Sequence, residues 1–354
     1  MSADSAKVPS VSSTPRVLAL LLSVSFSSFA ALFAKYALVG FSPFTMTALR
    51  VWIAALVLLP AAVRIVPGGL RWSSFVRALP MSLCYTGNIT LFALGIGFTT
   101  ALTSQLLYLL VPVLVLIGAR IFFREALTSG KVIGTLLGIA GVVFVLLGSL
   151  QGSLANSLGT PMGNILILSA AFSWSAFSLL AQRQSRSYHP LELSCYALLT
   201  SSVILPLLVL PDILRHQALH APLGWLAIVG ALGMALVVSA GRDFSFQWGV
   251  QGSSAFIAST MGFVGPFLTV AYAIPLLGEH LSANLLLSGV LIFSGLFFAV
   301  ILPARRQQRA RLLAEQVAPV LSTSDASDGQ APSGASDADN KTVLDHTERS
   351  GDDA

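Results

Sequence analysis

The chain has 354 residues, of which 55% are hydrophobic and only 10% are charged. A soluble domain normally carries about 25% charged residues, so the composition excludes an ordinary water-soluble globular protein. The net charge of +5 comes from Arg and Lys at the ends of apolar segments, so it does not indicate nucleic-acid binding.

A short polar stretch, residues 1–16, opens the chain and is predicted to be a cytoplasmic N-terminal segment. The apolar run that follows is too long for the core of a signal peptide and lacks a small-residue cleavage site. It is therefore predicted to be the first retained membrane span.

Ten apolar segments then follow one another, separated by turns. A bilayer core takes about 20 apolar residues as a helix, and backbone groups in lipid must bond within their own segment, so each segment is predicted to be a membrane-spanning helix. The predicted spans cover residues 17–39, 44–66, 78–98, 101–122, 131–149, 162–182, 191–211, 223–248, 254–277 and 284–303. Residues 304–354 form a basic flank and an acidic tail whose composition predicts a disordered cytoplasmic segment.

Basic residues gather at alternate ends of these spans. Lys and Arg are enriched on the cytoplasmic side of membrane proteins, which places both termini inside. The basic positions that then fall inside are Lys7, Arg16, Arg64, Arg71, Arg77, Arg120, Arg124, Lys131, Arg183, Arg186, Arg305, Arg306, Arg309 and Arg311. The outer loops carry little positive charge, namely Lys35 and Arg215.

Scarce residue types recur at a fixed spacing in the two halves of the chain. The residues Pro112, Glu125, Leu127 and Gly141 recur 154 positions later as Pro266, Glu279, Leu281 and Gly295. Each half holds five predicted spans, an odd number, so the halves enter the bilayer from opposite sides. The predicted fold is an all-α membrane protein with ten transmembrane helices in two inverted five-helix repeats. The first repeat covers residues 17–149, the second covers 162–303, and residues 150–161 connect them.

The repeated prolines and glutamates are assigned structural roles. Pro112 and Pro266 lie inside matching spans, where a proline kinks a helix and shapes either a cavity or hinge or an inert bend. Glu125 and Glu279 are predicted to cap the N-terminus of the next helix, with ion coupling as the alternative.

Gly134 and Gly138 form a GxxxG pattern, which Gly141 extends. Small residues let helix backbones approach closely in lipid, so this face is predicted to pack against another helix. The same kind of face is compatible with a homodimer.

Charged residues inside spans are the sharpest departures from the apolar pattern. Arg242 and Asp243 lie near the inner end of the eighth span, and a charge in a membrane is a functional hypothesis by default. Adjacent helix residues point about 100° apart, so at least one of the two should face a cavity or another partner. The alternative is that the span ends near Ala240 and leaves both in a wet loop. Arg50 in the second span either snorkels outward or points into the pore.

Polar and aromatic side chains supply candidates for a central cavity, which is normally apolar with a few polar anchors. The candidates that line it are Tyr85, Asn88, Gln105, Tyr108, Trp174, Trp248, Ser259 and Thr260, and for each of them ordinary helix packing or an interfacial anchor is the alternative. Asp243 joins this set through the family resemblance described below. Cys84 and Cys195 lie in apolar stretches and predict neither a disulfide nor a metal site. No catalytic or metal-binding motif is visible in the sequence, so we predict no enzyme activity, no cofactor and no metal.

Several stretches resemble the EamA-like family of the drug/metabolite transporter (DMT) superfamily. They are KYALVGFSPFTMTALR (35–50), FFREALTSGKVIGTLLGIAGVV (122–143), AAFSWSAFSLLAQR (170–183) and GPFLTVAYAIPLLGEHLSANLLLSGVLIFSG (265–295). The first span departs from the family because it lacks the usual Trp-Gly-Ser-Asn type of signature. The resemblance implies a ten-helix inverted-repeat carrier whose cavity is lined largely by helices 1, 3, 4, 6, 8 and 9. Such carriers commonly export amino acids, related metabolites or drugs.

The predicted function is therefore export of a small amphiphilic metabolite, amino acid or drug across a bacterial inner membrane by alternating access. Asp243 is the candidate for proton coupling. The partners expected are a small-molecule substrate and the lipid bilayer. A channel-like permease, a membrane-embedded sensor that uses the tail, and an enzyme acting on lipid are the alternatives.

Overall fold

The computed structural model describes residues 13–66, 68–123, 129–150, 158–220, 223–251 and 261–298. In these ranges the chain folds into helices joined by short turns, with an isolated bridge between Phe41 and Leu219 and no strand. The predicted all-α class is thus confirmed for the described part of the chain. Residues 299–354, which include the predicted cytoplasmic tail, lie outside the described residues.

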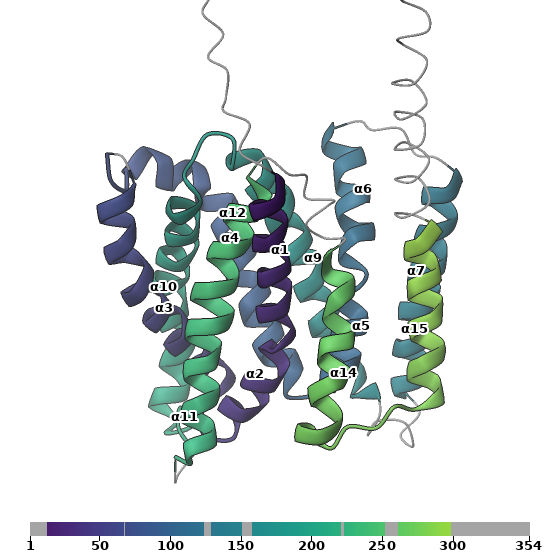
Figure 1. Ribbon diagram of the computed structural model, residues 1–354. Coiled ribbons are helices and arrows are strands. Elements are labelled where there is room, and N and C mark those ends of the chain that lie inside the picture. Colours follow the sequence, from purple (N-terminus) through teal and green to yellow (C-terminus); the bar gives the residue numbers. More distant parts are fainter. Residues whose placement is uncertain are drawn as a thin grey trace, which may run out of the picture. The chain divides into compact units, whose positions relative to one another are not determined.

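The helices of the first half are α1 (Ser13–Ser28), α2 (Ala30–Leu38), α3 (Pro43–Ile65), α4 (Trp72–Ile96), α5 (Ala101–Tyr108), α6 (Val111–Phe123) and α7 (Ser129–Leu150). Those of the second half are α9 (Pro161–Gln184), α10 (Pro190–Leu214), α11 (Trp225–Leu232), the π-helix η2 (Gly233–Gly241), α12 (Arg242–Val250), the short 3-10 helix η3 (Met261–Phe263), α14 (Val264–Leu277) and α15 (Ala283–Leu296). Figure 1 shows them as a bundle of roughly parallel axes.

Eight helical segments of the described residues are long and apolar enough to cross a membrane. They are Pro15–Leu38, Pro43–Ile65, Trp72–Ile96, Ala101–Gly118, Val132–Leu150, Pro161–Gln184, Pro190–Leu214 and Trp225–Val250. Two shorter apolar helices, Val264–Leu277 and Ala283–Gly295, lie where the ninth and tenth spans were expected. The protein is therefore a multi-pass membrane protein, while the count of ten spans and the inverted repeat remain predictions.

Three of the eight segments contain an interruption instead of one continuous α-helix: α1 gives way to α2, α5 to α6, and α11 passes through η2 into α12. At the second of these, the N–H groups of Leu109 and Leu110 donate to carbonyls three residues back, at 3.1 and 3.2 Å. Pro112 follows directly and has no N–H with which to continue the helical ladder. The predicted break at Pro112 is thus present, whereas Pro266 lies in the first turn of α14, where a missing N–H disturbs little.

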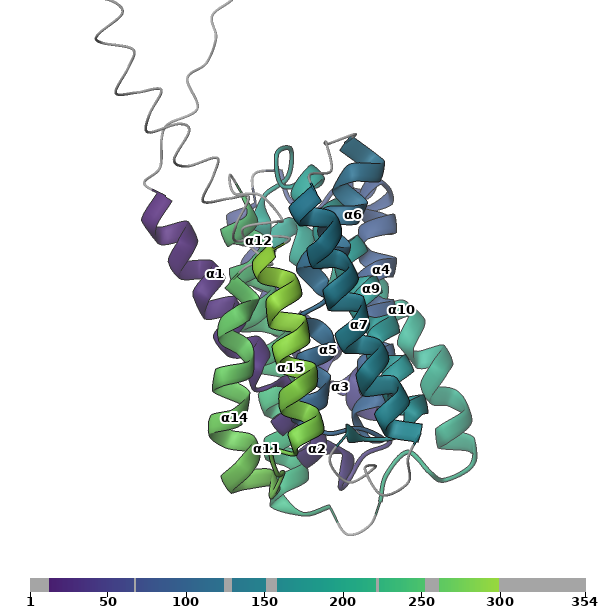
Figure 2. The ribbon, with the colours of Figure 1, turned by 90° about the vertical axis from the view of Figure 1, so that its right-hand side faces the viewer.

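Helices α7 and α15 lie side by side (Figure 2) and meet through glycines. A Cβ placed on Gly295 would lie 2.5 Å from the backbone nitrogen of Gly138 and 2.6 Å from the carbonyl oxygen of Gly134. A Cβ on Gly141 would lie 2.6 Å from Ile292. The predicted glycine face therefore packs within the chain. A homodimer stays a prediction.

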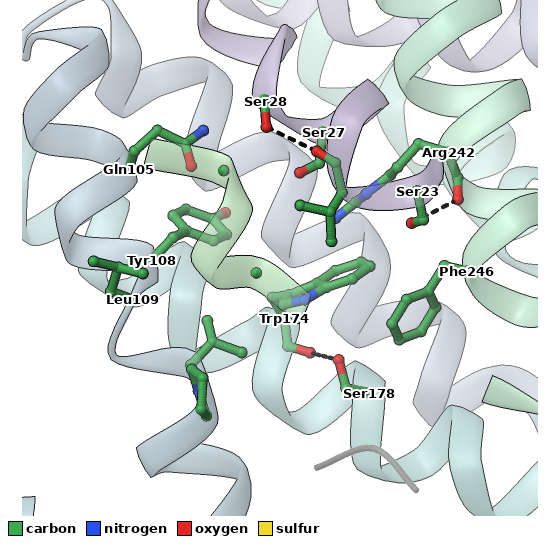
Figure 3. Close-up of a pocket in the computed structure, with 15 residues that line it drawn as sticks. Ser23, Ser27, Ser28, Gln105, Tyr108, Leu109, Trp174, Ser178, Arg242 and Phe246 are labelled. Atoms are coloured by element: carbon green, nitrogen blue, oxygen red, sulfur yellow. Dashed lines mark hydrogen bonds between the residues drawn. The ribbon is translucent and has the colours of Figure 1, made fainter. Parts of the chain in front are cut away.

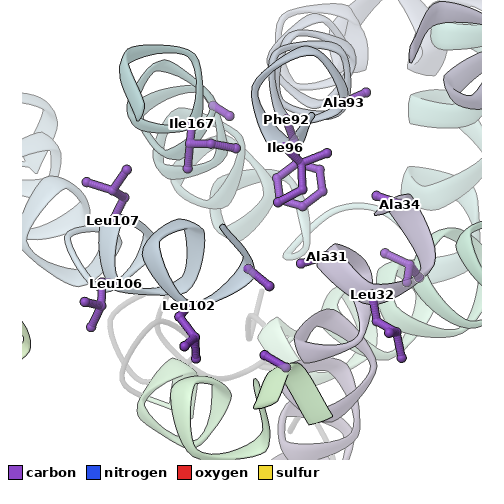
Figure 4. Packing of buried hydrophobic residues seen from close by; sticks show 14 of the residues in the cluster. Ala31, Leu32, Ala34, Phe92, Ala93, Ile96, Leu102, Leu106, Leu107 and Ile167 are labelled. Carbon is purple, nitrogen blue, oxygen red and sulfur yellow. The ribbon is translucent and has the colours of Figure 1, made fainter. Parts of the chain in front are cut away.

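Small side chains also pack the centre of the bundle. Ala31 and Ala34 of α2 face Phe92, Ala93 and Ile96 of α4 in one buried cluster, shown in Figure 4. The outside of the bundle is apolar as well, as the large side chains exposed there show: Leu56 by 74%, Val203 by 71% and Leu207 by 70%. An apolar exterior around a packed interior suits a lipid environment.

Candidate functional site

Two small cavities adjoin each other at the centre of the helices. The first, here called the Trp174 cavity, has a volume of about 80 Å³, and the second, the Arg50 cavity, has a volume of about 40 Å³. Both are lined by Ser27, Gln105, Tyr108 and Arg242, so these four side chains stand at the boundary between them. A ligand pocket usually measures about 300–1,000 Å³, so each of these two cavities is small for a bound ligand.

The lining comes from seven of the predicted spans. Serines of α1 lie on one side, Gln105 and Tyr108 project from α5, Trp174 projects from α9 and Arg242 from α12, as Figure 3 shows. Asn88 of α4 lines the Arg50 cavity, and Gly265 of α14 lines the Trp174 cavity. These helices belong to the first, third, fourth, sixth, eighth and ninth predicted spans, which the family resemblance implies for a central cavity. Arg50 of α3 adds the second span, which the resemblance does not include.

Arg242 is buried, with 7% of its surface exposed, and is compensated on two sides. One guanidinium nitrogen donates to Oδ1 of Asp243 at 2.9 Å. The centre of the guanidinium group lies 3.7 Å from the centre of the Trp174 ring, which is a close cation–π contact. The hydroxyl of Ser23 donates to the Arg242 carbonyl at 3.1 Å and ties α1 to α12.

Asp243 is buried behind Arg242 and lines neither cavity. Its second oxygen, Oδ2, accepts a hydrogen bond from the hydroxyl of Tyr85. Both carboxylate oxygens are thus occupied, one by a cation and one by a phenol. The alternative of a wet loop after Ala240 is wrong, because helix α12 continues to Val250 and buries both charged residues. The expectation that one of the pair faces a cavity is met by Arg242.

Arg50 points into the bundle and does not snorkel outward. It exposes only 2% of its surface and lies on the buried face of α3 with Met46 and Ala54, four residues away on either side. Its Nε donates to the hydroxyl of Ser239 in the π-helix at 2.8 Å, and its side chain lines the Arg50 cavity.

Asn88 joins three helices on the same side of the bundle. Its side-chain amide donates to the hydroxyl of Tyr108 at 2.7 Å and to the carbonyl of Ala170 at 2.8 Å. Gln105 faces α14, since a Cβ on Gly265 would lie 3.2 Å from the Gln105 side-chain oxygen. Polar groups of α4, α5 and α9 therefore converge here, next to Gly265 of α14.

Of the predicted lining residues, the structure brings four to the cavities: Asn88, Gln105, Tyr108 and Trp174. Tyr85 and Asp243 lie one layer behind them, and Ser259 and Thr260 fall outside the described residues. The predicted set omits Arg50, Arg242 and the α1 serines. Charge inside an apolar span is the sequence signal that finds the two arginines, whereas serines are too common to be singled out.

Glu279 binds a helix N-terminus, but not the one expected. Its carboxylate accepts from the N–H groups of Ala101 at 2.6 Å and Leu102 at 3.0 Å, at the start of α5. Lys35 lies 3.7 Å from the same carboxylate and donates to the carbonyl of Thr99 at 3.0 Å.

Helix α15 is capped instead by Ser282, whose hydroxyl accepts a hydrogen bond from the N–H group of Leu285. Gly278, at φ 65°, turns the chain so that Glu279 points back to α5. Its predicted counterpart, Glu125, lies outside the described residues.

Among the residues that the structure describes, no group of three or more His, Cys, Asp or Glu side chains is placed to hold a metal ion.

Comparison with known proteins points to one family. The family model described as the EamA-like transporter family matches residues 14–147 and 161–301. The transporter YyaM of Bacillus subtilis, itself uncharacterized, is 28% identical over 49% of this chain and 57% of its own length. An uncharacterized transporter of Archaeoglobus fulgidus is 24% identical over 80% of this chain and 98% of its own length.

A riboflavin transporter of Vibrio cholerae is 26% identical over 44% of this chain and 46% of its own length. A solved crystal structure superposes with a TM-score of 0.58 at 23% identity, covering 82% of this chain and 97% of the other. That likeness shows a shared fold.

Proposed function

Since the chain belongs to the EamA-like transporter family, we propose that it is a secondary carrier that exports a small metabolite, amino acid or drug by alternating access. The observation that carries the proposal is the pair of buried central cavities, lined by polar and charged side chains from six spans and from both halves of the chain. Intramembrane polar and charged residues that face a cavity are typical of substrate pathways.

The size of the cavities favours a carrier over a channel-like permease. A channel needs a continuous polar path, whereas the two cavities are small and separated by Tyr108, Gln105 and Arg242. In a carrier such a barrier moves as one half of the molecule rocks against the other.

Two observations support an inverted repeat. The family model matches two successive stretches of similar length. Equivalent glycines also make corresponding contacts, because Gly141 packs on α15 while Gly295 packs on α7. We place the protein in the bacterial inner membrane with both termini in the cytoplasm, as the distribution of Lys and Arg indicates.

Asp243 is the candidate for proton coupling. Its carboxylate binds Arg242, which lines both cavities, and accepts a hydrogen bond from Tyr85 on its other oxygen. A proton on Asp243 would weaken its ion pair and free Arg242 to move toward a substrate.

The function is tested by expressing the protein in a strain with reduced efflux and screening resistance to a panel of amino acids, metabolites and drugs. A positive compound is then loaded into proteoliposomes that contain the purified protein. Substrate movement against its gradient, driven by an imposed pH gradient, supports a carrier. Movement that only dissipates the substrate gradient indicates a facilitative permease. Loss of the resistance on deletion of residues 315–354 alone would favour a sensor instead.

A further inference from the structure

The central cavities are lined by two guanidinium groups and, within the described residues, by no carboxylate. Arg50 and Arg242 both line the Arg50 cavity, and Arg242 also lines the Trp174 cavity. The other acidic residues of the described ranges are engaged elsewhere. Glu192 binds Tyr196, Asp212 binds Ser42, and Glu279 caps α5. Asp243 is therefore a single negative charge beside two positive ones.

The two arginines differ in how they are compensated. Arg242 has the Asp243 carboxylate at 2.9 Å and the Trp174 ring beneath its guanidinium group. Arg50 has one hydrogen bond, to the neutral hydroxyl of Ser239. In the part of the chain that the structure describes, no carboxylate lies within ion-pair distance of Arg50. Asp243 attracts Arg50 from beyond ion-pair distance, but its direct ion pair is with Arg242. A buried charge without an ion pair of its own is strongly disfavoured in a membrane protein, so its retention in a cavity indicates that a further group supplies the partner.

We infer that Arg50 is the anchor for an anionic group of the transported molecule, so that the substrate is a small organic anion, such as a carboxylate with an apolar body. This inference rests on the proposed transport function. The planar guanidinium fork matches a carboxylate. The remaining surface of the Arg50 cavity includes Ile89, Phe92 and Val238, which suits the apolar body.

The same geometry argues against a zwitterion or a cation as the preferred substrate. An ammonium group needs an acceptor with a free negative charge, and both oxygens of Asp243 are already held by Arg242 and Tyr85. Carbonyls and hydroxyls would have to serve instead, next to two positive charges.

The test uses purified full-length protein in detergent and measures its melting temperature with matched probes. One series is indole-3-acetate, indole-3-acetamide and tryptamine, and a second is hexanoate, hexanamide and hexylamine. Within a series the body is the same and only the head group changes. The carboxylates should raise the melting temperature, while the amides and amines should not.

Three variants locate the effect. Arg50→Gln should weaken carboxylate binding at least about tenfold, because a charge-assisted hydrogen bond is lost. Without ligand, this variant should melt at or above the wild-type temperature, since a buried charge that has no ion pair of its own has been removed. Arg50→Lys keeps the charge and should retain part of the response. Arg215→Gln, at an exposed site after α10, is the control and should respond like the wild type.

Three outcomes would overturn the inference: neither carboxylate stabilises the wild type, Arg50→Gln responds as the wild type does, or Arg50→Gln melts lower without ligand, which would make Arg50 a structural residue. Transport of the same probes in proteoliposomes separates the two proposals. Transport of the amide or amine but not the carboxylate would leave the carrier standing and overturn the anion assignment. Carboxylate binding through Arg50 without any transport would support the anion site and contradict the carrier.

Discussion

The buried charges of this molecule form a short chain of contacts that runs from the cavities to the interior. Arg242 faces the cavities, Asp243 lies behind it, and Tyr85 closes the far side of the carboxylate. The Trp174 ring covers Arg242 and packs against Phe177 and Phe246, with ring centres 4.7 and 4.9 Å apart. A change in the charge of Asp243 therefore acts on the cavity wall through one side chain, that of Arg242.

The coupling role of Asp243 leads to a first prediction. In Asp243→Asn the side chain has no titrating proton, so transport should lose its dependence on an imposed pH gradient, measured as substrate flux in proteoliposomes with and without the gradient. Substrate exchange at equal pH should persist. Unchanged dependence on the gradient in the variant would exclude Asp243 as the coupling site.

The same substitution should lower stability, because it leaves Arg242 buried without its ion-pair partner. Removing one member of a buried pair destabilises a protein by about 3–5 kcal/mol. The double variant Arg242→Gln/Asp243→Asn removes both charges and should recover most of the lost melting temperature. The melting temperatures of the single and double variants show how much folded protein each contains. A loss of pH-gradient dependence in a variant that remains folded is then an effect on coupling.

Irregular helices place these residues. Ser239, the partner of Arg50, lies in the π-helix η2, and Arg242 and Asp243 begin α12 directly after it. π-helical turns are rare and frequently occur at functional sites. The sequence shows that charged residues lie in this span, but it does not predict the change from α-helix to π-helix, since residues Gly233–Gly241 continue the apolar pattern of the span. The direct pairing of Arg242 with Asp243 could not be derived from the ideal angle between neighbouring helix residues, because the long Arg242 side chain lets its guanidinium group reach the carboxylate of the next residue.

The contact between α7 and α15 leads to a second prediction. In Gly295→Val the new side chain would overlap the backbone of Gly138, where even a Cβ comes within 2.5 Å. We expect a loss of about 1–3 kcal/mol, as for other overpacked interiors, seen as a lower melting temperature. The matched control is Gly289→Ala on the same helix, whose Cβ would lie at 3.6 Å from Leu106, an ordinary contact. If both variants melt alike, the close approach of the two helices is wrong.

The cap on α5 leads to a third prediction. Glu279→Gln removes the negative charge that meets the N-terminus of α5 and the Lys35 ammonium group, so we expect stability to fall by about 1–2 kcal/mol. Ser282→Ala removes the cap of α15 and should lower stability by about 1 kcal/mol.

The two effects should be additive in the double variant, because the two side chains cap different helices. Strong coupling between them in thermal unfolding would show that Glu279 caps α15 after all.

At the scale of the whole molecule, the sequence predicts a membrane bundle well, because length and hydropathy are sufficient to identify spans. The eight long spans lie within a few residues of their predicted positions. The partner of Glu279 was missed, because it depends on which helices are neighbours in space and 177 or more residues separate the groups in sequence. The lining of the cavities was predictable in part, since Trp174 and Asn88 are conspicuous in apolar spans, whereas the cavity-facing serines of α1 are not.

The opposite orientation of the two halves leads to the last prediction. Ala126 and His280 occupy equivalent positions of the repeat, 154 residues apart, beside Glu125 and Glu279. In a background in which Cys84 and Cys195 are replaced by Ser, single cysteines at positions 126 and 280 should react on opposite sides of the membrane. Cysteine at 280 should be labelled in intact cells by an impermeant maleimide. Cysteine at 126 should be labelled only after the cells are opened, because three basic residues, Arg120, Arg124 and Lys131, hold that end of the first half inside. Labelling of both cysteines in intact cells, or of neither, would mean that the halves are not inverted, and the proposed inverted-repeat carrier would be wrong.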